Sequence, residues 1–177
     1  MNDSDHRSPP TLARSVPAEG PEPSLPSRLR PWLEGARRLL TEVIDQGSDH
    51  VVLGPSWLTR FVLRGSLADL PDEPGDLQIC YRVQWDHCEA LTRAVDEAGG
   101  RPLPPRRAPI PITAELRRGS APLRVGFPWG TAVLLPEVPG LGGIDAIYGN
   151  TVFFDWAGLE LRWFDPAGAS VRRPLGS

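Results

Sequence analysis

A chain of 177 residues with 40% hydrophobic residues and six Trp has the size and composition of one globular domain, which excludes a wholly disordered chain. Its net charge of −3 gives no global electrostatic reason for tight nucleic-acid binding. The chain contains no Lys, which excludes Schiff-base, Walker-type and kinase-type lysine chemistry and leaves phosphate contacts to Arg, backbone N–H groups or a metal ion.

The cysteine content and the N-terminal sequence indicate the cellular compartment in which the protein is expected. Cys80 and Cys88 are too few for a disulfide scaffold. The N-terminus is too polar for a signal peptide, and no apolar run approaches the length of a membrane span. The exclusive use of Arg, with 21 Pro and 18 Gly, is typical of a GC-rich bacterial genome. We therefore expect a cytoplasmic bacterial protein with free thiols and no membrane partner.

The N-terminal segment differs from the rest of the chain. Residues 1–27 are rich in Pro, Ser and acidic residues and hold almost nothing that could form a core. This composition predicts a disordered tail, with a docking peptide as the alternative. Residues 28–177 then form a single domain.

The first half of that domain alternates helices and strands. The apolar spacing predicts a helix over 31–46, with Pro31 in the first turn and Gly47 after the last. Residues 51–58 are interpreted as a loop with a possible helical turn. Residues 60–64 are interpreted as a short buried strand that ends at Gly65-Ser66. Residues 77–85 alternate with a period of two, which predicts a strand. Asp86 then opens a helix that stops at Gly99.

The second half is predicted to be mostly β-structure. Residues 112–117 and 123–127 are interpreted as a hairpin, and 131–135 as another strand. Residues 151–155 and 159–164 are interpreted as a C-terminal hairpin across a Trp-Ala-Gly turn. The order of elements predicts an α+β fold, a mixed β-sheet with helices packed on one face.

One stretch carries a functional motif. A short apolar strand running into Gly65-Ser66 is followed, after a loop, by Asp76 at the start of the next strand. This arrangement resembles the nucleotidyltransferase superfamily, and within it the AbiEii-type bacterial toxins. The resemblance covers residues 30–135 and also includes residues 123–130, which resemble the family's third-carboxylate strand and the turn after it. It implies a nucleotidyltransferase-like core followed by C-terminal β-hairpins.

The resemblance also implies a set of site residues. Gly65 and Ser66 would hold the phosphates of an NTP, and Arg64 would add positive charge. Asp76 would bind Mg²⁺ and be the catalytic carboxylate, because nucleotidyl transfer needs divalent metal to offset triphosphate charge. Such enzymes place two carboxylates at i and i+2 of a strand, where both face the same side.

The sequence departs from that pattern at two carboxylates. The second position is Gln78, and residues 123–127 hold no acid where a third is expected. Glu115 is the candidate substitute as a metal ligand, with Asp69 and Asp72 as further options. One secure carboxylate predicts a degenerate nucleotidyltransferase that retains nucleotide and Mg²⁺ binding.

Other interpretations stay open. Gly65-Ser66 is also typical of a strand-end turn, and Asp76 of a strand start. The cluster of Cys80, His87 and Cys88 matches no zinc spacing. The chain is alternatively a non-enzymatic interaction module, a protein partner within a defence or toxin–antitoxin operon, with exposed Trp side chains and hairpins as its binding surface. A third alternative is an unrelated enzyme that uses Asp145 or Asp155.

Overall fold

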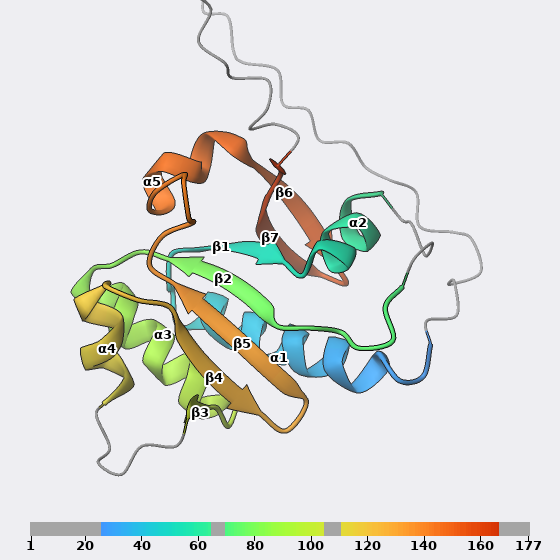
Figure 1. The fold of residues 1–177 in the computed structure, drawn as a ribbon, viewed down its shortest axis with the longest axis horizontal. Coiled ribbons are helices and arrows are strands. Elements are labelled where there is room, and N and C mark those ends of the chain that lie inside the picture. The colour runs from blue at the N-terminus through green and yellow to red at the C-terminus, as the bar shows by residue number, and fades with distance from the viewer. Residues whose placement is uncertain (1–25, 65–69, 105–110, 167–177) are drawn as a thin grey trace, which may run out of the picture.

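The protein is an α+β domain built on one seven-stranded mixed sheet (Figure 1). The computed structural model describes residues 26–64, 70–104 and 111–166, and of residues 62–64 it describes the backbone alone. The predicted tail therefore lies almost entirely outside the described residues. The elements in chain order are α1 (Arg30–Asp45), β1 (His50–Gly54), α2 (Ser56–Arg64), β2 (Leu77–Tyr81), α3 (Trp85–Glu97), β3 (Arg101–Leu103), α4 (Ile112–Arg118), β4 (Leu123–Phe127), β5 (Gly130–Leu135), α5 (Ile144–Ile147), the 3₁₀ turn η1 (Tyr148–Asn150), β6 (Thr151–Trp156) and β7 (Leu159–Phe164).

The strands run in the order β3-β4-β5-β2-β1-β7-β6. The pairs β2–β5 and β1–β7 are parallel, and the other four pairs are antiparallel. Strands β1 and β2 are sequence neighbours joined through α2, and they pair in register from His50–Tyr81 to Val52–Ile79 before a shift at Gly54. The end of β1 and the start of β2 therefore lie side by side.

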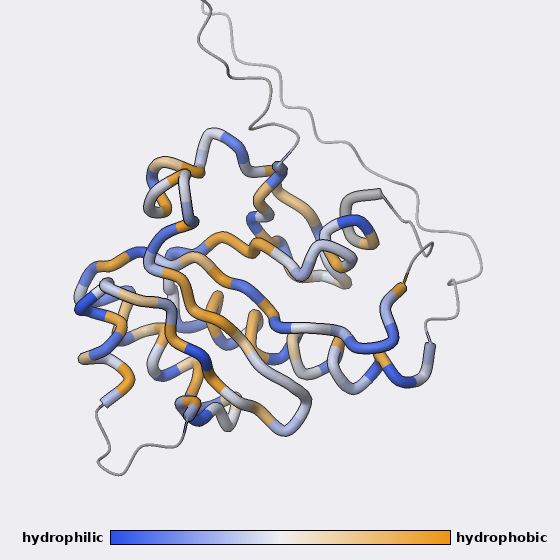
Figure 2. Tube along the Cα trace, viewed as in Figure 1, coloured by the Kyte–Doolittle hydropathy of each residue, from blue (hydrophilic) through white to orange (hydrophobic). Residues whose placement is uncertain are grey.

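The main core lies between one face of the sheet and helices α1 and α3. Helix α1 buries Trp32, Ala36, Leu39, Leu40 and Val43, which recur at helical spacing. They pack on strand residues such as Val52, Ile79 and Leu134, all fully buried. Figure 2 shows the apolar positions gathered on α1 and on the central strands.

The opposite face of the sheet is covered only in part. Ile144 and Ile147 of α5 pack on Val51 and Cys80, which alternate with the residues of the main core along β1 and β2. Farther along the same face, Gln78 and Arg124 are exposed. This uncovered part of the sheet is called the open face below.

The α+β class, the helices now labelled α1 and α3, and the C-terminal hairpin are confirmed. Three other predictions are wrong. Residues 51–58, interpreted as a loop with a possible helical turn, form most of β1 and the start of α2. Residues 60–64 belong to helix α2, where Trp57, Leu58 and Phe61 make one apolar face on the main core. Residues 112–117 form helix α4, so the predicted hairpin does not exist and β4 pairs with β5 instead.

Local signals in the sequence account for helix α4. Helix α4 follows Pro111, has Arg117 and Arg118 in its last turn, and ends at Gly119 in the left-handed region with φ of 55°. The strand predicted over 77–85 also ends earlier, at Tyr81, because Trp85 begins α3. None of the described helices is long and apolar enough to span a membrane.

Candidate functional site

Asp76 precedes β2 and lies at the margin of the open face. In β2, Leu77 and Ile79 point into the main core, so Gln78 and Asp76 belong to the other side of the sheet. Gln78 pairs in register with Val133 of β5, which in turn pairs with Arg124 of β4. The three side chains therefore form a row across three strands of the open face.

Asp76 is engaged by a guanidinium. Nη2 of Arg124 lies 3.0 Å from Oδ2 and 3.4 Å from Oδ1 of Asp76. The two side chains are 58% and 34% exposed, so solvent reaches the pair. No hydrogen bond of Arg124 Nε or Nη1 is found within the described parts of the chain. Arg124 thus balances the charge of Asp76, and its Nε and Nη1 keep donors that have no partner in the described parts of the chain.

Glu115 does not join Asp76. It lies in α4, which packs against α3 on the helical side of the sheet. The neighbouring Leu116 carbonyl accepts a hydrogen bond from the hydroxyl of Tyr81, at the far end of β2 from Asp76. The prediction of Glu115 as a second metal ligand is therefore not supported by the geometry. Asp72 forms an exposed ion pair with Arg28 (3.1 Å). Within the described ranges, no three His, Cys, Asp or Glu residues gather into a possible metal site.

The phosphate-binding residues expected from the motif lie at the end of α2 and directly after it in the sequence. Gly65, Ser66 and Asp69 lie outside the described residues, and only the backbone of Arg64 is described, at the end of α2. The strand-to-helix turn that does approach Asp76 is Gly54-Pro55-Ser56. There Gly54 is opposite Gln78, and Ser56 begins α2. The sequence Gly54-Pro55-Ser56 could have indicated this turn. It was missed because residues 51–58 were interpreted as a loop.

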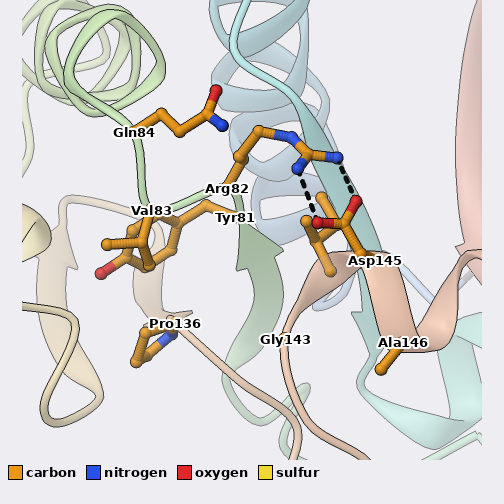
Figure 3. A pocket seen from close by; sticks show the side chains of 9 residues that line it. Tyr81, Arg82, Val83, Gln84, Pro136, Gly143, Asp145 and Ala146 are labelled. Carbon is orange, nitrogen blue, oxygen red and sulfur yellow. Dashed lines mark hydrogen bonds and ion pairs between the residues drawn. The ribbon is translucent and has the colours of Figure 1, made fainter.

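A second polar cluster lies at the other end of β2 and was not predicted; Figure 3 shows two of its members, Arg82 and Asp145. Arg82 follows this strand directly. Its Nε donates to Oδ2 of Asp49 (2.7 Å), and its two Nη atoms donate to the carboxylate of Asp145 in α5 (2.8 and 2.6 Å). The hydroxyl of Tyr148 donates to Oδ1 of Asp49, whose own N–H donates to Nδ1 of His87 (3.1 Å).

The charges of this cluster stabilise one another. Burial raises the pKa of Asp49, but hydrogen bonds from Tyr148 and Arg82 outweigh it and leave that pKa below its ordinary value. The hydrogen bond from Arg82 lowers the pKa of Asp145 as well. Both acids, and chiefly their hydrogen bonds to Arg82, raise the pKa of the guanidinium. Asp49, Arg82 and Asp145 are therefore ionised at neutral pH, and their hydrogen bonds join α5 to the end of β2.

A shallow cavity of about 390 Å³ adjoins Arg82 and Asp145. It lies where β2 and β5 end, between the segment from Tyr81 to Gln84 and the start of α5, as Figure 3 shows. All three guanidinium nitrogens of Arg82 already bind carboxylates, so Arg82 is poorly placed to bind an anion there. Asp145 and Asp155 are the two acids of the alternative enzyme hypothesis. Asp145 is an ion-pair partner of Arg82, and the Asp155 carboxylate accepts a hydrogen bond from Gly158 N–H in the β6–β7 turn (2.8 Å).

The contacts of the cysteines and of most tryptophans are those of residues that stabilise the fold. Cys80 and Cys88 are buried and unpaired with each other, and burial raises the pKa of Cys80 to about 11, which leaves it protonated at neutral pH. Trp129 and Trp156 pack partly buried against the main core. Trp85 is 53% exposed, and its ring lies 3.9 Å from the guanidinium carbon of Arg117.

Comparison of the chain with family models, with curated proteins and with solved structures gives no match. The two clusters are therefore interpreted from their own geometry.

Proposed function

We propose that the protein is a degenerate nucleotidyltransferase-like domain that binds nucleotide phosphate through Arg124 instead of Mg²⁺. The observation that carries the proposal is the ion pair between Asp76 and Arg124 on the open face. In this arrangement the positive charge opposite the Asp76 carboxylate comes from an arginine side chain of the protein and not from a metal ion.

The charges of the open face argue against metal-dependent transfer. Two-metal chemistry needs several oxygen anions to hold the cations. Here Asp76 is followed by neutral Gln78, and the neighbouring positions on β5 are Thr131 and Val133. A single carboxylate already paired with Arg124 offers Mg²⁺ little net charge.

The surroundings of Asp76 favour an anionic ligand. Arg124 is exposed and keeps two guanidinium nitrogens for a phosphate, a geometry in which Arg binds well. The N-terminus of α2, at Ser56, follows the end of β1 beside β2 and adds a partial positive charge. Trp57 Nε1 donates to the Pro74 carbonyl (2.6 Å) and fixes this helix end beside the loop that precedes Asp76.

Calorimetric titration with each NTP, with Mg²⁺ and with EDTA, tests the proposal. We expect binding that does not require Mg²⁺ and that Arg124→Ala weakens at least about tenfold, because a charge-assisted contact is lost. Asp76→Asn should strengthen binding, since it removes the carboxylate that competes for Arg124. Arg117→Ala, an exposed arginine on α4, is the matched control and should bind like the wild type.

The opposite results separate the alternatives. Binding that requires Mg²⁺ and is lost in Asp76→Asn would show a retained metal site. Absence of heat with every NTP at concentrations that detect millimolar affinity would overturn the nucleotide proposal altogether.

A second candidate function is a non-enzymatic interaction module, such as a partner protein of a bacterial defence or toxin–antitoxin system. The exposed aromatic side chains favour it, since Phe153 is 63% and Trp85 is 53% exposed. Co-purification of the tagged chain with its operon neighbours, compared with the Trp85→Ala and Phe153→Thr variants, tests this function.

A further inference from the structure

The two edges of the sheet differ in how they are protected against pairing. Strand β3, at one edge, has three residues, includes Pro102 and is followed by Pro104, and proline lacks the N–H that pairing needs. Strand β6, at the opposite end of the sheet (Figure 1), has six residues, Thr-Val-Phe-Phe-Asp-Trp, with one charge and no proline. Its register with β7 is unbroken over all six pairs, so no bulge turns it away.

The hydrogen-bonding groups on the outer edge of β6 can be assigned. Asp165 N–H donates to the Asn150 carbonyl (2.8 Å), which makes this pair, just before β6, a hydrogen-bonded one. Hydrogen-bonded pairs alternate along an antiparallel ladder, so Val152 and Phe154 bond to β7. The N–H and C=O groups of the alternate residues, Thr151, Phe153 and Asp155, therefore point to the outer edge. No described strand pairs there.

The outer edge is also apolar. Phe153 is 63% and Val152 is 36% exposed. The guanidinium of Arg162 lies 4.7 Å from the centre of the Phe153 ring, on the face that Phe153 and Arg162 share as a cross-strand pair. An exposed edge with an apolar centre is typical of a strand that pairs with another chain.

We propose that β6 pairs with β6 of a second copy of this chain, antiparallel, with a two-fold axis at Phe153. In this register Thr151, Phe153 and Asp155 face Asp155, Phe153 and Thr151 of the second copy. These are the residues whose backbone groups point outward, so the ladder continues across the axis. An isologous dimer with one continuous sheet results.

The side chains of β6 are complementary to themselves in this register. The two Phe153 rings meet at the axis with an Arg162 guanidinium beside each. Asp155 is opposite Thr151 of the other copy, whose hydroxyl already donates to the Tyr148 carbonyl (2.8 Å), so this pair brings no like charges together and adds no hydrogen bond between the side chains. On the other face, Val152 is opposite Phe154. Aromatic–aromatic and aromatic–β-branched pairs stabilise cross-strand contacts, and no like charges meet. This complementarity argues for a second copy over an unrelated strand.

The dimer is independent of the proposed nucleotide site. Strands β1 and β7 separate β6 from β2, and Asp76 lies before β2. Pairing at β6 therefore leaves the open face around Asp76 and Arg124 accessible, so either proposal can fail without the other.

Sedimentation equilibrium of the full chain over a range of concentrations tests the interface. We expect a monomer–dimer equilibrium, with Phe153→Lys weakening association at least about tenfold because two added charges would meet at the axis. Phe153→Thr, which keeps a strand-forming residue, should weaken association to a smaller extent and guards against a folding defect. Trp85→Lys changes another exposed aromatic (53%, against 63% for Phe153) away from β6 and should leave association unchanged.

Hydrogen exchange identifies the contact. On dimerisation the amides of Thr151, Phe153 and Asp155 should become protected, whereas those of Val152 and Phe154 are protected at all concentrations. A monomer with rapidly exchanging outer amides at all concentrations would overturn the proposal. A monomer in which these amides are already slow would also overturn it and would show that another part of the chain covers β6. A dimer that survives Phe153→Lys would place the interface elsewhere.

Discussion

Arg82 joins three segments that lie far apart in the sequence. It follows β2, binds Asp49 before β1, and binds Asp145 in α5. Its side chain is 19% exposed, and that of Asp49 is 29% exposed, so this ion pair is shielded from water more than the pair at Asp76, chiefly at the arginine. Asp145, by contrast, is 76% exposed.

Removal of Arg82 should destabilise the fold. Arg82→Leu leaves the half-buried Asp49 without its ionic partner, and a partner lost from a buried pair costs more than a surface pair contributes. We expect the free energy of unfolding to fall by about 2 kcal/mol, less than for a fully buried pair because solvent reaches the cluster. Urea unfolding at pH 7 measures the change. Asp145→Asn is the matched comparison and should have a much smaller effect, and equal losses would contradict this ranking.

The half-buried ring of His50 makes stability depend on pH. Its Nδ1 hydrogen-bonds to the Ser48 carbonyl (2.8 Å), while Nε2 is buried without a hydrogen-bond partner among the described residues. Burial lowers the pKa of His50 below its ordinary value of 6.5, and the hydrogen bond to Ser48 and the charge of Asp49 only partly oppose this.

The direction of this pH dependence follows from whether the folded or the unfolded state binds the proton more readily. Above pH 6.5 His50 is neutral in both states, and its contribution to stability is complete. As the pH falls below 6.5, the unfolded chain takes up a proton that the folded protein resists until its own lower pKa is reached. The urea midpoint should therefore fall between pH 7.5 and pH 5, and His50→Gln should flatten that dependence. An unchanged slope in the variant would show that another group is responsible.

At the scale of elements, α1 and the β4–β5 turn fit together at a glycine. A Cβ placed on Gly35 would lie 2.1 Å from Cγ of Trp129, so the indole occupies the space of a side chain. Trp129 stacks on Phe127, with ring centres 4.9 Å apart, and meets Trp32 edge to face at 5.8 Å. The ring therefore cannot move without disturbing both neighbours.

Gly35→Ala should destabilise the protein although Ala favours helices over Gly by about 1 kcal/mol. Overpacking of this kind costs typically about 1–3 kcal/mol, so we expect a net loss near 1 kcal/mol in chemical unfolding. The control is a double-mutant cycle with Trp129→Ala, which creates room at the contact. In that background Gly35→Ala should become neutral or stabilising, whereas an unchanged cost would show that the backbone at residue 35 is responsible.

The long periodic elements were predictable, and the short ones were not. Helix α1 was predicted within one residue at each end because its apolar stripe, from Trp32 to Val43, runs through most of a 16-residue helix. Helices α2 and α4 have nine and seven residues, too few turns for the periodicity to be distinguished from a strand. Among the site residues, Asp76 could be found from its place before an alternating strand. Arg124 and Arg82 could not, because their partners depend on which strands become neighbours.

At the scale of the whole molecule, β2 separates two differently organised ends of one sheet. At its end, Arg82 is enclosed by two carboxylates and fastens α5. At its start, Asp76 and Arg124 face solvent on a surface that no described helix covers. The first arrangement is suited to stability, and the second leaves charged groups available to a ligand.

Conversion of the open face into a metal site tests whether the layout is that of a nucleotidyltransferase. Gln78→Asp combined with Arg124→Ala places two carboxylates at i and i+2 on one side of a strand and removes the competing guanidinium. We expect the double variant to bind Mn²⁺ with a dissociation constant on the order of 1 mM, because the site would have few protein ligands. Titration of free Mn²⁺ by electron paramagnetic resonance measures this binding.

Each single variant serves as a control for that conversion. Gln78→Asp alone should bind Mn²⁺ more weakly than the double variant, since Arg124 still occupies Asp76. Arg124→Ala alone should bind weakly as well, because one carboxylate and one amide supply too little charge. Equal affinities in all three proteins would mean that residues 76 and 78 do not act on one cation. The arrangement at the start of β2 would then be a strand start stabilised by an ion pair, and the proposed nucleotidyltransferase-like site would be ruled out.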